Sequence, residues 1–205
     1  MWIYYVPGPK QLWGDEQMYR QAALELLDNG RTEENFLWPP LYSSFVALML
    51  RAGNGSLLPL QLLQTLLLVA SALLLRDLCL RLTGERDVAD LAALTLLIYP
   101  PLVAFAQYVW PEILHMTLLL AALWILMARR DRLPWSAALG FALGLALLTK
   151  GVLGPFVPVL LVPLALDGNR RRALQRVGLA LAVLLLTLAP TILDNYRRTG
   201  SATMG

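Results

Sequence analysis

Residues 57–75 read LLPLQLLQTLLLVASALLL, a run of uncharged and mostly apolar side chains. The hydrocarbon core of a bilayer is about 30 Å thick, and an α-helix crosses it in about 20 apolar residues. The run therefore predicts a membrane-spanning helix. Further stretches of the same kind lie at 88–108, 111–128, 134–150, 152–167 and 174–192. Together they predict an all-α, polytopic bundle of transmembrane helices.

The composition excludes a soluble globular domain. Apolar residues make up 58% of the chain and charged residues 15%, whereas soluble domains carry about 25% charged residues. Cys79 is the sole cysteine, which excludes an intrachain disulfide and a cysteine metal cluster. The sequence contains no glycine-rich phosphate loop, nucleophile elbow or zinc motif. We predict no cofactor and no nucleic-acid partner.

A helix break is predicted between the fourth and fifth stretches. Lys150 and Gly151 separate them, and Gly154, Pro155 and Pro158 follow. Proline removes a backbone donor and disrupts a helix interior. Short helices that meet at a break are therefore expected here in place of two ideal spans.

Arginines are concentrated in alternate connections between the stretches. Those at 76–87, 129–133 and 167–176 hold Arg76, Arg81, Arg86, Arg129, Arg130, Arg132, Arg170, Arg171, Arg172 and Arg176. Basic residues near span ends favour the cytoplasm. We therefore expect an integral protein of the bacterial inner membrane whose bundle is formed by residues 57–193. Residues 1–56 and the tail at 194–205 are expected outside the cytoplasm.

Two short helices are predicted before the first span. Residues 15–28 form an amphipathic pattern, with Met18, Tyr19, Ala22, Ala23, Leu26 and Leu27 on its apolar face. Asp15 is expected to cap this helix and Gly30 to end it. Pro39 and Pro40 open a second helix that runs to about Arg51. Both are too short or too polar to span, so they are expected on the outer membrane surface.

The start of the chain lacks the basic segment that begins a signal peptide. Residues 1–9 resemble the outer end of a transmembrane helix whose body is missing. We expect the chain to be a fragment or an incomplete reading frame, with a truncated tail.

Two groups of charged residues have the chemistry of a site. Asp15 and Glu16 are adjacent carboxylates at a helix start, where a carboxylate either accepts a proton from a hydroxyl or interacts favourably with the helix end. Lys150 interrupts an apolar region, so it either binds a lipid phosphate or extends to the interface.

A third group lies near the start of the 111–128 stretch. Glu112 and His115 share one helix face at i, i+3. They either contribute to a metal site or are polar residues at an interface, and two ligands do not make a zinc site. A divalent cation is therefore not predicted. Gln107 and Tyr108 either bind sugar hydroxyls or belong to the interfacial aromatic belt.

Three motifs together resemble a known family. Gly14-Asp15-Glu16-Gln17-Met18-Tyr19, Pro39-Pro40-Leu41-Tyr42 and Thr149-Lys150-Gly151 are similar to motifs of the membrane glycosyltransferases of the type C fold. The closest group is the bacterial one related to protein O-mannosyltransferases and lipid A aminoarabinose transferases. The resemblance covers essentially the whole chain, but only the N-terminal part of a family member.

The resemblance implies sugar transfer on the extracytoplasmic face. The donor would be a sugar on a polyprenyl phosphate, and an acceptor hydroxyl would attack the anomeric carbon with inversion. Asp15 would be the catalytic base, with Glu16 in support, and Lys150 and Arg20 would bind the donor phosphate. Candidate substrate contacts are Tyr19, Tyr42, Gln107, Glu112 and His115. The acceptor, whether a lipid, glycan or protein hydroxyl, is not indicated.

The chain departs from the aminoarabinose-transferase-like pattern at two positions. Members of that group often carry basic residues where this chain has Met18 and Trp38. Two other functions remain open: a non-catalytic protein that binds membrane lipids, and a small transporter with Lys150, Glu112 and His115 along its path.

Overall fold

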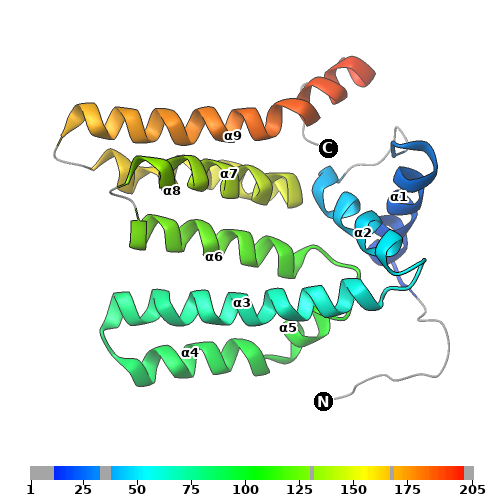
Figure 1. Cartoon of the computed structure of the whole chain (residues 1–205), viewed down its shortest axis with the longest axis horizontal. Helices are drawn as coiled ribbons and strands as arrows, with labels where there is room; N and C mark the ends of the chain where they lie inside the picture. Colours follow the sequence, from blue (N-terminus) through cyan, green and yellow to red (C-terminus); the bar gives the residue numbers. More distant parts are fainter. Residues whose placement is uncertain (1–11, 33–37, 130–131, 167–168, 201–205) are drawn as a thin grey trace.

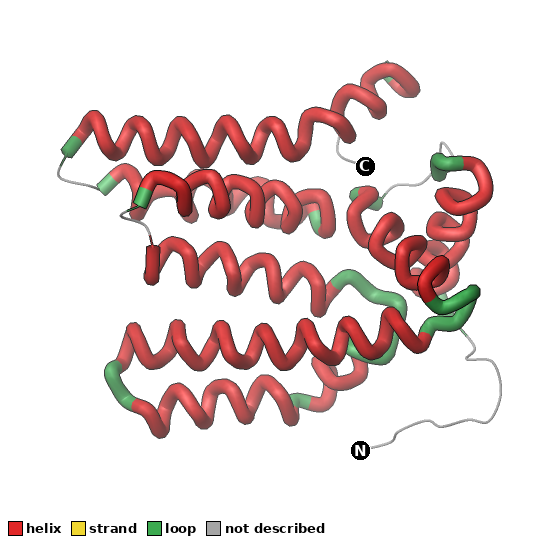
Figure 2. Tube along the Cα trace, in the orientation of Figure 1, coloured by secondary structure: helices red, strands yellow, loops and turns green. Residues whose placement is uncertain are grey.

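The computed structural model describes residues 12–32, 38–129, 132–166 and 169–200. Within these ranges the regular structure is helical, with no strand (Figure 2). In chain order the helices are α1 (Asp15–Asn29), α2 (Pro40–Ala52), α3 (Leu58–Thr83), α4 (Arg86–Ile98), α5 (Pro100–Phe105), α6 (Glu112–Arg129), α7 (Leu133–Thr149), the 3₁₀ helix η1 (Gly151–Phe156), α8 (Val157–Ala165) and α9 (Arg170–Thr199). The predicted all-α fold is confirmed.

The longer helices form a bundle in which successive elements alternate in direction (Figure 1). Two of the described helices, α3 and α9, are long and apolar enough to cross a bilayer, and α6 and α7 are shorter apolar helices. The turn after α3, the start of α7 and the start of α9 lie at one end. Helices α1 and α2 lie at the other end, where α3 begins. The chain is therefore an integral membrane helical bundle with two different ends.

The stretch 88–108 is not one span, as the sequence predicted, but two helices. Helix α4 ends at Ile98, and α5 starts at Pro100. Tyr99 between them is extended, with φ −65° and ψ 113°. A residue before proline is pushed out of the helical region, and Pro100 is followed by Pro101. The two prolines therefore stop α4 before it can span.

Helices α3 and α9 extend beyond the predicted stretches 57–75 and 174–192. Several arginines assigned to connections are in fact helical, among them Arg76, Arg81 and Arg176. Arginine is a good helix former. In α3 the Nε of Arg81 also pairs with Asp77 one turn earlier, at 2.6 Å. The helices therefore continue through their charged ends. Helix α9 also crosses residue 193, the predicted end of the bundle.

The predicted break at Lys150 is confirmed. Lys150 is extended, with φ −147° and ψ 116°, between the end of α7 and η1. The predicted fifth span begins as the 3₁₀ helix η1, and its only α-helix is the nine-residue α8. The predictions for residues 1–9 and for the end of the tail, 201–205, lie outside the described residues.

Helices α1 and α2 pack on each other and on the end of the bundle. Their shared core includes Tyr19, Tyr42, Leu60 of α3 and Val109. The predicted stop at Gly30 is confirmed, with φ +70° and an N–H bonded to the Leu26 carbonyl.

Two details of the α1 prediction were wrong. Asp15 is the first residue of the helix, and the N-cap is Gly14. Met18 and Leu27 are exposed, whereas Glu16 is buried. Glu16 is tolerated inside because its carboxylate has a backbone hydrogen-bond partner, described below.

Candidate functional site

The predicted phosphate-binding lysine forms an ion pair at the end of the bundle that carries α1 and α2. The Nζ of Lys150 donates to Oε1 of Glu112 at 2.6 Å. The side chains are 36% and 23% exposed. Helices α6 and α7 are antiparallel neighbours, so the first residue of α6 and the residue after α7 meet at one end. The structure therefore joins two predicted site residues that are distant in sequence.

Glu112 also influences the tyrosines of α1 and α2. Burial and then the Glu112 carboxylate raise the pKa of Tyr19 well above its usual value, and Asp15 adds to the effect. Burial and the same carboxylate raise the pKa of Tyr42. Both phenols therefore stay protonated at physiological pH. The charges of Asp15 and Glu112 both act on Tyr19, so the two carboxylates lie within electrostatic range of the same phenol.

Asp15 and Glu16 face different surroundings. Asp15 is exposed. Glu16 is 4% exposed, and its Oε1 accepts a hydrogen bond from the backbone N–H of Val109 at 2.9 Å. Consecutive helical residues point about 100° apart, so one carboxylate can face solvent while the other is buried. Only Asp15 is open to a substrate in this conformation. Glu16 fixes the segment that leads into α6.

Gln64, a residue that sequence reasoning missed, holds the same segment from the side of α3. Its side chain is fully buried. Its Oε1 accepts from the Tyr42 hydroxyl at 2.8 Å. Its Nε2 donates to the carbonyls of Tyr108 at 2.8 Å and Ala106 at 3.2 Å. Gln64 thus links α2, α3 and the connection from α5 to α6, which ends at Glu112.

The remaining predicted site residues differ in their exposure and in their partners. Tyr42 is fully buried, which assigns it to the packing of the site. Nδ1 of His115 lies 3.1 Å from the Ala146 carbonyl, so it donates to α7. Gln107 is exposed and held by α3, because its carbonyl accepts from Gln61 at 3.1 Å. Arg20 is exposed on α1.

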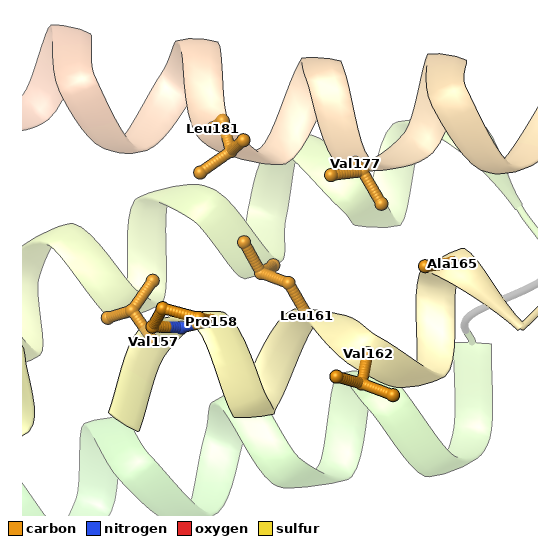
Figure 3. Close-up of a pocket in the computed structure, with 7 residues that line it drawn as sticks. All are labelled: Val157, Pro158, Leu161, Val162, Ala165, Val177 and Leu181. Carbon is orange, nitrogen blue, oxygen red and sulfur yellow. The ribbon is translucent and has the colours of Figure 1, made fainter. Parts of the chain in front are cut away.

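A pocket of about 320 Å³ lies between α8 and α9 (Figure 3). All of its lining residues are apolar: Val157, Pro158, Leu161, Val162, Ala165, Val177 and Leu181. Such a pocket suits a hydrocarbon chain and offers no partner to a phosphate or a sugar. The charged candidate residues Glu112 and Lys150 do not line this pocket. No three potential metal-binding side chains gather anywhere in the described ranges.

The family model for dolichyl-phosphate-mannose-protein mannosyltransferases matches residues 38–193, more than half of the chain. The chain belongs to this mannosyltransferase family. Comparisons with curated proteins and with solved structures returned no match. The resemblance to membrane glycosyltransferases of the type C fold is thereby confirmed.

The region matched to the mannosyltransferase family contains the ion pair. It includes Tyr42, Gln107, Glu112, His115 and Lys150, and it begins after Asp15, Glu16, Tyr19 and Arg20. The sequence of this mannosyltransferase-family chain could have predicted the pairing of Glu112 with Lys150. Glu112 and Lys150 are equally distant from position 131, in the arginine-rich connection of a helical hairpin. The sequence could also have pointed to Gln64, because an uncharged polar residue inside a span tends to face the bundle interior.

Replacing Gln64 with leucine is expected to destabilise this mannosyltransferase-family protein by about 2 kcal/mol. The change keeps a similar volume but leaves the buried Tyr42 hydroxyl and the carbonyl of Ala106 without this partner. Thermal unfolding in detergent micelles measures the effect. Gln61→Leu is the matched control, since its amide bonds a carbonyl at the exposed surface. Equal melting temperatures for the two variants would contradict the role given to Gln64.

Proposed function

We propose that this chain transfers a sugar from a polyprenyl-phosphate-linked donor to a hydroxyl acceptor, with inversion. The observation that carries the proposal is the ion pair of Lys150 and Glu112 at the end of the bundle that also carries α1. Asp15 is exposed at the start of α1, and its charge and that of Glu112 both act on Tyr19. A reaction that takes a proton from a hydroxyl and releases a phosphate needs an accessible carboxylate and a cation close together.

In the proposed reaction the acceptor oxygen forms a bond to the anomeric carbon, and the bond from that carbon to the phosphate oxygen breaks. The acceptor proton passes to the Asp15 carboxylate. The lipid phosphate leaves with the bonding electrons, and Lys150 stabilises its charge. Arg20, exposed on α1, would offer the donor phosphate a second positive charge. Glu16 supports Asp15 indirectly, because it holds α1 against Val109.

The two ends of the bundle support a membrane orientation for the proposal. The starts of α4, α7 and α9 carry Arg86, Arg132 and Arg170, at the end opposite α1 and α2. With these basic residues in the cytoplasm, Asp15 and Lys150 face the outside. A donor anchored in the membrane by a polyprenyl chain would meet them there. The apolar pocket between α8 and α9 would accept hydrocarbon on the lipid side.

The test of the proposal is a transfer assay with the full chain in lipid vesicles. Labelled mannose is supplied either as β-linked polyprenyl-phosphate mannose or as a nucleotide sugar, with hydroxyl acceptors from lipid, glycan and peptide classes. We expect transfer only from the lipid donor, and a product that α-mannosidase cleaves. Transfer from the nucleotide sugar would contradict the donor class. Lipid-phosphate binding without transfer from any donor would favour the non-catalytic, lipid-binding function.

A further inference from the structure

The ion pair of Lys150 implies a competition within the phosphate site. Lys150 already has an anionic partner, because Glu112 Oε1 lies 2.6 Å from its Nζ. A donor phosphate that uses the same ammonium group must share it with this carboxylate or displace it. We infer that Glu112 is the resident anion of the site, which holds Lys150 between turnovers and yields it to the donor phosphate. This inference rests on the proposed function.

The pair is weak enough to exchange. Both side chains are partly exposed, at 36% for Lys150 and 23% for Glu112. Ion pairs in contact with solvent contribute little to stability, because water screens the charges and the long side chains lose rotamer freedom. A phosphate offers more acceptor oxygens to the ammonium than a single carboxylate oxygen does. The donor therefore has an advantage when it arrives.

The backbone at Lys150 favours movement of its side chain. Lys150 lies between α7 and η1 with extended dihedral angles, φ −147° and ψ 116°. Its N–H still bonds the Ala146 carbonyl at 2.9 Å, which anchors the main chain. The side chain is thus free of the rotamer limits that a helix imposes. It can turn from Glu112 to a ligand while α7 stays intact.

Glu112 keeps a favourable environment after Lys150 leaves. It is the first residue of α6, where the positive end of the helix dipole stabilises a carboxylate. Its second oxygen, Oε2, is buried and has no hydrogen-bond partner among the described residues. Lys150 therefore satisfies only part of this carboxylate.

The exchange also assists product release. Transfer converts a phosphodiester donor into a phosphate monoester, which carries more negative charge and binds Lys150 more strongly. A carboxylate that competes for the same ammonium group opposes this retention. Because product release often limits turnover, Glu112 would increase kcat even though it weakens lipid binding.

The test measures binding of polyprenyl phosphate, without any turnover, to the full chain in nanodiscs. Glu112→Gln removes the competing charge, so the Kd is expected to fall roughly fivefold. Lys150→Met is expected to raise the Kd about tenfold. Glu85→Gln is the matched control, because it removes the same charge from the turn after α3, at the opposite end of the bundle. It should leave the Kd unchanged.

The outcomes separate this inference from the proposed function. If Lys150→Met weakens binding and Glu112→Gln does not strengthen it, Glu112 does not compete with the phosphate for Lys150. The role of Lys150 in phosphate binding is then still supported. If Lys150→Met binds polyprenyl phosphate as tightly as the unmodified chain does, Lys150 does not bind the phosphate. Both the exchange and the role of Lys150 in the proposed function are then wrong. Should Glu112→Gln fold poorly, Glu112→Asp replaces it. Its shorter side chain keeps the charge but withdraws from Lys150, so tighter binding is again expected.

Discussion

Asp15→Asn is expected to lower kcat for sugar transfer by about 10²- to 10⁴-fold, the range that a general base contributes. The amide has nearly the same shape as the carboxylate but cannot take the acceptor proton at neutral pH. Asp15 is exposed at the start of α1, and its side chain makes no cap for that helix, whose N-cap is Gly14. The loss should therefore come from chemistry and not from unfolding.

The measurement is steady-state transfer from polyprenyl-phosphate mannose, with kcat and donor KM determined separately. Donor KM is expected to stay within about threefold, because the role proposed for Asp15 concerns the acceptor proton and not the phosphate. Asp28→Asn provides a control on the same helix, since Asp28 is exposed near its other end. A kcat for Asp15→Asn as high as that of this control would remove Asp15 from the catalytic role.

Gly140→Ala is expected to destabilise the bundle by about 3 kcal/mol, a large effect for one added methyl group. A Cβ at Gly140 of α7 would lie 2.1 Å from the carbonyl oxygen of Ala180 in α9. The obstacle is backbone, so no side chain can move aside. One turn later, a Cβ at Gly144 would meet Thr187 at 2.7 Å. The two glycines form a small-residue surface that allows α7 and α9 to approach closely.

Gly178→Ala is the matched control for this prediction. Gly178 lies in α9, and a Cβ there would have no atom within 4 Å. The same chemical change should stabilise the helix by up to about 1 kcal/mol, since alanine favours helices. Unfolding in detergent, followed by circular dichroism, compares the two variants. Similar stabilities would show that α7 and α9 do not pack closely in the membrane.

The sequence predicted the helical class and most helix positions because apolar runs are long and bilayer thickness limits their length. The break at Lys150 was predictable for the same local reason, since glycine and prolines follow it. The division of 88–108 into α4 and α5 was missed. Pro100 and Pro101 lie inside an apolar run. The prediction followed the length of that run and did not allow for the helix end that a proline imposes on the residue before it.

The candidate site was only partly predictable. Lys150 and Glu112 were each identified from charge near a span end, but their pairing depends on the packing of α6 against α7. The different surroundings of Asp15 and Glu16 depend on Val109, which is 93 residues from Glu16 in sequence. Local pattern does not contain such contacts. Gln64 was missed although it is an uncharged polar residue inside a span, because the backbone carbonyls to which its amide donates cannot be read from residue identity.

The hydrogen bond from Val109 to Glu16 has a consequence for protein engineering. Chimeras that exchange acceptor preference between homologues would naturally be cut after α2, so that the first 56 residues move as one cassette. Such a cut separates Glu16 from the segment it holds, and it separates Tyr42 from Gln64. A graft that fails at this junction would be misread as an incompatible acceptor. The cassette should instead carry Gln64 and residues 105–112 with it, as a discontinuous unit.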